Sequence, residues 1–128
     1  MSKIIIIILI HAIADFFFQG SKLSKLKVLK MPYLFEHVGI YTLFFIVLSP
    51  ILLGLTFFQG LIFSLFNGIM HLIIDYLTGK FKLKYNDHES NYLAVIGIDH
   101  TLHIIILITS YIYLYPNELN SFSPLFNT

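Results

Sequence analysis

Apolar residues gather in four runs along the chain, and shorter polar stretches separate these runs. The runs cover residues 4–19, 34–55, 58–78 and 93–115. A helix that spans a lipid bilayer needs roughly 20 predominantly apolar residues. The pattern therefore predicts an all-α, polytopic membrane protein in which residues 1–128 form a single domain, a bundle of four transmembrane helices. Pro50 is expected to kink or end the second helix.

The composition supports a membrane protein. Hydrophobic residues make up 57% of the chain and charged residues 12%, with a mean hydropathy of +0.82. A small soluble domain could not bury so much apolar surface. The chain has no cysteine, which excludes disulfide bonds and thiolate metal ligands. We expect the lipid bilayer as a partner and no nucleic acid, and a homo-oligomer is left open.

The lysines predict how the chain is oriented. Connectors 20–33 and 79–92 hold seven of the eight lysines, and the remaining one is Lys3. With four spans, both connectors lie on one side of the membrane. The positive-inside rule then predicts a multi-pass protein of the inner (cytoplasmic) membrane with both termini outside. Connector 20–33 itself is either an amphipathic helix at the interface or a solvated loop.

Three histidine–aspartate pairs lie inside the apolar runs, and the members of each pair are four residues apart. They are His11 with Asp15, His71 with Asp75, and Asp99 with His103. Four residues make about one helical turn, so each pair projects from one face of its helix. All three pairs fall in the cytoplasmic halves of the helices, whereas the outer halves look almost purely apolar. The pattern therefore predicts a single polar layer near the cytoplasmic surface.

Histidine and carboxylate are ligands of zinc and manganese, and a bound cation would offset the cost of burying aspartates. It would also make a bound water acidic enough to act as a nucleophile near neutral pH. We therefore predict a divalent metal ion, zinc or manganese rather than magnesium. Its expected ligands are His11, Asp15, His71, Asp75, Asp99 and His103, and the expected catalytic groups are Asp15, Asp75 and Asp99. The structural alternative is that each pair only fixes the register between helices.

Five further polar residues are candidates for contacts behind the ligands or with a substrate. They are Gln19, His37, Tyr41, Tyr76 and His100. His37 is also compatible with an ordinary interfacial residue, and the tyrosines are compatible with an interface belt. His100 follows Asp99 directly and therefore points about 100° away from it around the helix.

Four motifs occur in a fixed order along the chain. They are His11-x-x-x-Asp15-Phe16-x-x-Gln19, His37-x-x-x-Tyr41-Thr42, His71-x-x-x-Asp75-Tyr76 and Asp99-x-x-x-His103. From residue 5 to residue 110, the sequence resembles domain-of-unknown-function family 3307, small polytopic membrane proteins of bacteria and phages. His100 departs from that pattern, which has glutamine after the aspartate. The pattern is also similar to that of membrane-bound metal-dependent hydrolases.

The function predicted from these observations is metal-dependent hydrolysis of a lipid-like or phosphate-containing substrate at the cytoplasmic face. The hydrolase reaction is an analogy with the second family. An amphiphilic, anionic substrate would suit the depth of the site and the neighbouring lysines. Two alternatives are divalent-metal or proton transport, and a non-catalytic accessory or scaffold protein of the membrane.

Overall fold

Helix is the only regular structure in the part of the chain that is described, residues 2–17 and 20–119 of a computed structural model. Helix α1 (Lys3–Ala12) continues into a π-helical turn, η1 (Ile13–Phe17). The helices that follow are α2 (Gly20–Leu29), α3 (Met31–Leu53), α4 (Phe57–Lys84), α5 (Glu89–Leu114) and the short α6 (Pro116–Leu119). The predicted all-α class is therefore confirmed for these residues.

Three helices, α3, α4 and α5, are long and apolar enough to cross a membrane. They correspond to the second, third and fourth predicted spans. The first predicted span consists of the 10 residues of α1 and the 5 residues of η1. The described residues thus contain three candidate membrane spans, and the first segment is a shorter helix.

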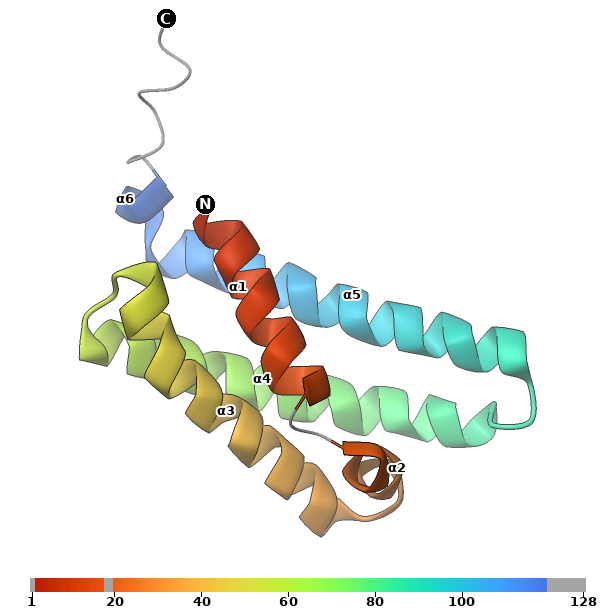
Figure 1. Cartoon of the computed structure of the whole chain (residues 1–128). Helices are drawn as coiled ribbons and strands as arrows, with labels where there is room; N and C mark the ends of the chain where they lie inside the picture. Colours follow the sequence, from red (N-terminus) through yellow and green to blue (C-terminus); the bar gives the residue numbers. More distant parts are fainter. Residues whose placement is uncertain (1, 18–19, 120–128) are drawn as a thin grey trace, which may run out of the picture.

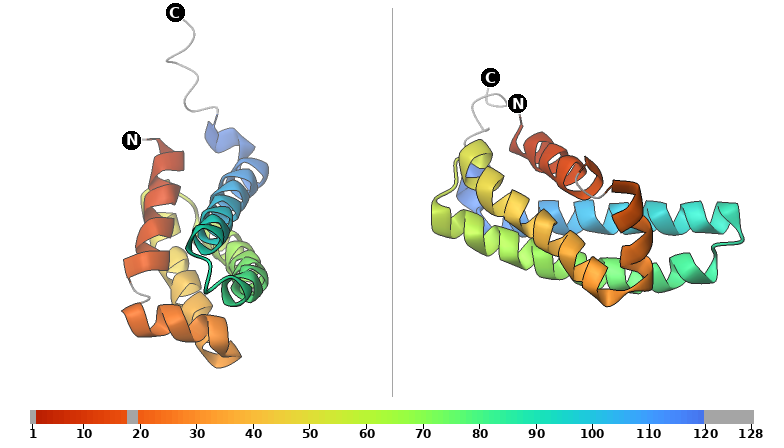
Figure 2. Two further views of the ribbon diagram at one scale, coloured as in Figure 1. Left: turned by 90° about the vertical axis from the view of Figure 1, so that its right-hand side faces the viewer. Right: turned by 60° about the horizontal axis from the view of Figure 1, so that its bottom comes forward.

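Figure 1 shows how the helices are arranged. Helices α3 and α4 form an antiparallel hairpin, and α4 forms a second hairpin with α5. Helix α1 is inclined to these long helices and packs against α3 and α5, whereas α2 packs against α3 and α4. The start of α1 and α6 lie at the same end of the bundle but on opposite sides of it, and the far end of the first segment leads towards α2 (Figure 2). The first segment therefore runs from the end of the bundle that carries α6 to the part of the bundle where α2 packs.

The helix ends differ from the sequence prediction at two places. Pro50 lies inside α3 and does not end it; the helix continues to Leu53 and stops where Gly54 adopts a left-handed conformation (φ 70°). Helix α4 extends past the predicted end at residue 78, through Lys84, and α5 begins at Glu89. The connector between these two helices is therefore short.

The connector 20–33 is largely helical, because α2 occupies Gly20–Leu29. Of the two predictions for this connector, the helix is confirmed and the solvated loop is wrong. Lysine and leucine are good helix formers, and they dominate this stretch.

Small residues allow α3 and α4 to approach closely. A Cβ atom added to Gly60 would lie 2.5 Å from Cγ of Pro50, and one added to Gly68 would collide with the side chain of Thr42. Such contacts between small residues are a common way to pack helices in membranes. Thr42 and Gly68 are close in sequence to Tyr41 and His71, so this contact helps to set the register of the polar layer.

The surface of the bundle is apolar and much of the interior is polar. Phe58 is 73% exposed and Ile51 is 71% exposed, whereas twelve polar or charged side chains are buried among the residues whose side chains are described. This distribution is the reverse of that in a soluble domain, and it suits a protein surrounded by lipid.

The prediction of almost purely apolar outer halves is wrong. Ser49, Ser64, Asn67 and Ser110 are buried there. The Nδ2 group of Asn67 donates to Ser110 Oγ at 3.0 Å, and Ser64 Oγ donates to a carbonyl of its own helix at 2.6 Å. Short uncharged side chains can satisfy their polar groups on the helix backbone. A few of them therefore fit into an apolar helix without making the run as a whole polar.

Candidate metal centre

Six buried histidines and aspartates form one cluster inside the bundle. The first segment supplies His11 and Asp15, α3 supplies His37, α4 supplies His71 and Asp75, and α5 supplies His103. Four separate parts of the chain thus bring imidazoles and carboxylates to one place, as their common depth in the sequence predicted. The cluster lies towards the end of the bundle where α2 packs.

The shortest distances in the cluster converge on Nε2 of His37. Nε2 of His71 lies 3.0 Å from it, Oδ1 of Asp15 lies 3.1 Å away and Oδ2 of Asp75 lies 3.4 Å away. A ring nitrogen can donate one hydrogen bond or accept one, so it cannot satisfy all three neighbours. A cation shared by these groups can satisfy all three neighbours at once.

Three of these atoms have the spacing of ligands around one metal ion. Oδ1 of Asp15, Nε2 of His37 and Nε2 of His71 are separated by 3.0, 3.1 and 3.5 Å. Zinc–ligand bonds of about 2.0–2.1 Å in a tetrahedral arrangement place the ligands about 3.3 Å apart. These three groups, which we call the Asp15–His37–His71 triangle, match one face of such a tetrahedron.

Asp15 lies in the π-helical turn η1 rather than in regular α-helix. A π-helical turn is wider than an α-helical turn and is often found at functional sites. Oδ2 of Asp15 lies 3.9 Å from Nε2 of His11, whereas Oδ1 of Asp15 faces His37 in α3 and His71 in α4. The two oxygens of Asp15 therefore face different neighbours.

Tyr41 holds two of the histidines in place. Its ring stacks on His71 with centroids 4.0 Å apart, and its hydroxyl group lies 3.3 Å from Nδ1 of His11. The other face of His71 stacks on His103, with centroids 4.1 Å apart. Tyr41 is fully buried, so it belongs to the cluster and not to an interface belt.

Asp99 is placed differently from the other predicted ligands. Thr78 Oγ1 donates to it at 3.0 Å, and Lys82 Nζ lies 2.6 Å from its Oδ2. Its Oδ1 is 3.7 Å from Nδ1 of His103, whose Nε2 faces Asp75 Oδ1 at 3.8 Å. Among the described residues, no group of three candidate ligands includes Asp99. Asp99 thus faces the side of His103 that is turned away from Asp75, where it can orient the imidazole ring of His103.

The remaining predicted residues fall in different places. His100 is 29% exposed, and its Nδ1 lies 3.6 Å from Asp15 Oδ2, close enough for the two to share an ion. Tyr76 is 42% exposed and lies beneath the ammonium group of Lys80, outside the cluster. Gln19 lies outside the described residues.

Two lysines belong to the site, although the sequence analysis used them only to predict topology. Lys27 Nζ lies 2.9 Å from Asp75 Oδ2 and 3.2 Å from His37 Nε2, and Lys82 pairs with Asp99. The positions of Asp75 and Lys82, seven residues apart on one helix, could have revealed Lys82. No local pattern points to Lys27, because it reaches the site only through the packing of α2.

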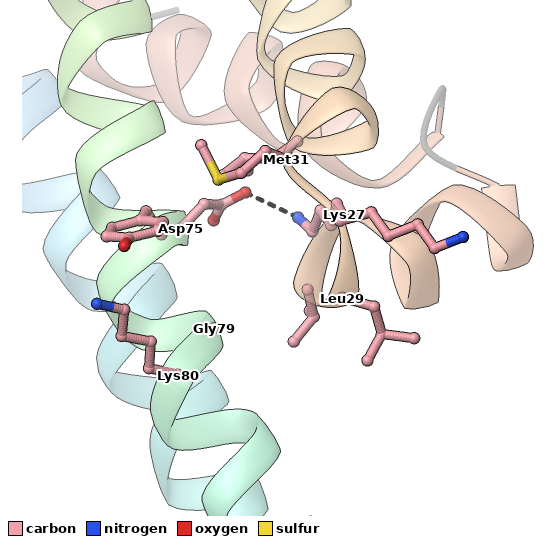
Figure 3. Close-up of a pocket in the computed structure, with 10 residues that line it drawn as sticks. Lys27, Leu29, Met31, Asp75, Gly79 and Lys80 are labelled. Atoms are coloured by element: carbon pink, nitrogen blue, oxygen red, sulfur yellow. Dashed lines mark hydrogen bonds and ion pairs between the residues drawn. The ribbon is translucent and has the colours of Figure 1, made fainter.

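Two clefts, both lined by Lys27 and Val28 of α2, reach residues of the polar layer. Figure 3 shows the first, a cavity of about 160 Å³ between α2 and α4, with Lys27 and Asp75 paired inside it and Lys80 at its edge. The second, also about 160 Å³, is lined by Asp15, Lys27, Lys82, Asp99 and His100 among others. Both clefts combine lysine ammonium groups with carboxylates of the polar layer.

Several ring nitrogens and oxygens in the cluster lack a hydrogen-bond partner among the described residues. They include Nε2 of His11, Oδ1 of Asp75 and Nε2 of His103. A buried polar atom left unpaired costs about 1–3 kcal/mol. A bound cation would satisfy such atoms without any change in the fold, so the residues present fit a metal ion.

Comparison with known proteins gives one match. The sequence model of a family described as "Protein of unknown function (DUF3307)" matches residues 4–127. No match was found among curated proteins or among solved structures.

Proposed function

We propose that the chain, which belongs to the DUF3307 family of proteins of unknown function, is a membrane-embedded, metal-dependent hydrolase of lipid-like, phosphate-containing substrates. The observation that carries this proposal is the Asp15–His37–His71 triangle, which has the dimensions of a metal site, and two lysine-lined clefts reach its member Asp15 and the neighbouring Asp75. The reaction class follows from what such a site can do chemically, and the family description states no activity.

The ligand set favours zinc or manganese. Imidazole nitrogens outnumber carboxylate oxygens in the triangle, and magnesium prefers sites made of oxygen. When bound, the ion would polarise a phosphoryl oxygen and make a water molecule acidic enough to attack phosphorus near neutral pH.

The chain's own residues then supply binding and proton transfer. Lys80 and Lys27 line the first cleft and can attract an anionic headgroup. Asp75 Oδ1 has no hydrogen-bond partner among the described residues and lies near the triangle, so we assign it the role of accepting a proton from the attacking water. Asp99 faces Nδ1 of His103 at 3.7 Å, beyond hydrogen-bond distance, and its charge favours the ring orientation that turns Nε2 towards Asp75.

The same geometry favours a hydrolase over a transporter. The clefts open on the lysine-bearing side, whereas the other half of the bundle is filled by buried aromatic side chains such as Phe45, Phe63 and Tyr111. The buried polar groups in that half are serines and an asparagine, which do not exchange protons near neutral pH. An ion would have to pass this aromatic layer to cross the membrane.

We further propose that the first segment is the fourth crossing of a single-domain bundle. It begins at the same end of the bundle as α6, which follows the last span, and leads to α2 on the side that carries the lysines. Fifteen residues reach about 22 Å at 1.5 Å per residue, less than the roughly 30 Å of a bilayer core. Local thinning of the bilayer would accommodate the difference.

The lysine distribution gives a testable orientation in the inner membrane. We expect the turn between α4 and α5 to be cytoplasmic and α6 to be outside. Single cysteines at the exposed positions Asp87 and Asn117 report on the two sides, because the natural chain has no cysteine. In intact cells an impermeant thiol reagent should label Asn117→Cys and spare Asp87→Cys. The opposite labelling would place the lysines and both clefts outside the cytoplasm.

The hydrolase proposal is tested on the full chain purified in detergent without chelator. Elemental analysis should find zinc or manganese, and the loaded protein should release phosphate from a panel of phosphatidic acid, a long-chain alkyl phosphate and a polyprenyl diphosphate. A metal-free protein that cannot be loaded would overturn the proposal. Metal flux into sealed vesicles without phosphate release would replace the hydrolase with a transporter.

A further inference from the structure

We infer that the cluster is built for two divalent cations rather than one, bridged by the carboxylate of Asp15. The first ion takes the Asp15–His37–His71 triangle, and the second takes Asp15 together with His11, His100 and His103. This inference rests on the proposed function and deepens it, since a two-ion site favours phosphate chemistry in particular.

The two oxygens of Asp15 face two different sets of histidines. Oδ1 lies 3.1 Å from Nε2 of His37 and 3.5 Å from Nε2 of His71. Oδ2 lies 3.6 Å from Nδ1 of His100 and 3.9 Å from Nε2 of His11. A carboxylate that binds one ion through each oxygen is the usual bridge in two-metal sites, where the ions are about 3.5–4 Å apart.

Unpaired ring nitrogens are independent evidence for the second set of ligands. Both ring nitrogens of His103, Nε2 of His11 and Nδ1 of His100 are buried without a hydrogen-bond partner among the described residues. His11 and His103 are themselves almost fully buried, with centroids 5.5 Å apart. One ring nitrogen each of His11 and His103 lies within 4.8 Å of a carboxylate oxygen of Asp15, so a second cation there would take one nitrogen from each ring.

A third candidate group, formed by His71, Asp75 and His103, does not add another ion. It takes His71 from the triangle and His103 from the second set, so it competes with both. The pair of groups that can be filled together is therefore the one that shares only Asp15.

Two ions would also explain the choice of substrate. The combined positive charge of two divalent ions exceeds the combined negative charge of the carboxylates of Asp15, Asp75 and Asp99. The ammonium groups of Lys27 and Lys82 add further positive charge. A net positive layer inside a membrane protein is costly unless an anion balances it. A phosphate group that enters through the second cleft, beside His100 and Lys82, would provide that balance.

The test counts metal ions and detects their coupling, with the full chain in detergent and manganese as the probe. We expect two ions per chain in the wild type and an electron paramagnetic resonance spectrum of exchange-coupled Mn²⁺. His100→Gln removes a ligand from the second site alone, so it should leave one ion and an uncoupled spectrum. The matched control is His88→Gln, an exposed histidine at the start of α5, which should keep two coupled ions.

His37→Gln is the complementary variant, since it removes a ligand from the triangle alone, and it should also leave one uncoupled ion. One ion per wild-type chain, unchanged by His100→Gln, would overturn the two-ion inference. If that one-ion protein still releases phosphate, the proposed hydrolase stands. Two coupled ions without phosphate release would uphold the inference and overturn the hydrolase.

Discussion

Replacing Asp75 with asparagine is expected to leave the bundle folded and to lower phosphate release by about 100- to 10,000-fold, the usual contribution of a positioned general base. Asparagine keeps the shape of the side chain and an oxygen for Lys27, which lies 2.9 Å from the present carboxylate. It cannot accept the proton that we assign to Asp75. The loss of negative charge beside the triangle should also weaken metal binding about 10- to 100-fold. Phosphate release and metal titration on the same preparation measure both effects.

The matched control is Asp87→Asn, which neutralises an exposed carboxylate in the turn between α4 and α5. This variant should behave as the wild type in both measurements. A fully active Asp75→Asn would remove Asp75 from the reaction. An Asp75→Asn that fails to fold, while Asp87→Asn folds normally, would favour the scaffold alternative, in which buried pairs mainly fix the helices in register.

Replacing Lys82 with methionine is expected to destabilise the folded protein by about 3–5 kcal/mol, the cost of removing one partner of a buried ion pair. Lys82 Nζ lies 2.6 Å from Oδ2 of Asp99, and Asp99 is almost completely buried. Without the ammonium group, the carboxylate would keep only the hydroxyl group of Thr78 as a close donor. Reversible unfolding in mixed detergent micelles, followed by circular dichroism, measures the change in free energy.

Lys84→Met is the control for this experiment, because Lys84 lies on the same helix with its side chain exposed. We expect a change within about 0.5 kcal/mol there, as for most surface substitutions. The double variant Lys82→Met, Asp99→Leu should recover most of the stability, since it leaves no unpaired charge. Equal effects of Lys82→Met and Lys84→Met would show that Lys82 serves only to orient the chain in the membrane.

The placement of these lysines has a functional consequence. Lysines that set topology by charge need only lie on the correct side of the membrane, at any position in a connector. Lys27 and Lys82 instead lie within 3 Å of buried carboxylates. The residues that orient the chain therefore also supply positive charge to the candidate site and its two clefts.

The sequence alone determined the helical class, three long apolar helices and the faces that carry the histidine–aspartate pairs. These features depend on local periodicity: an apolar run of sufficient length forms a helix in lipid, and residues four apart share a face. The four ordered motifs were sufficient to indicate the family, which the match over residues 4–127 confirms. The small buried polar residues of the outer half were missed, because a few scattered uncharged residues leave the average hydropathy of each run apolar.

Only the tertiary structure decided which of the polar groups meet. His37 lies at the centre of the cluster because α3 and α4 pack closely, and Asp15 faces two sets of histidines because its turn is π-helical. Asp99 has the same spacing to its histidine as the other aspartates, yet Thr78 and Lys82 hold it apart from the candidate ligands. Lys27 reaches Asp75 across 48 positions of sequence through the docking of α2. Periodicity fixes the face of one helix, but the relative placement of several helices depends on packing between residues distant in sequence, and no local pattern encodes it.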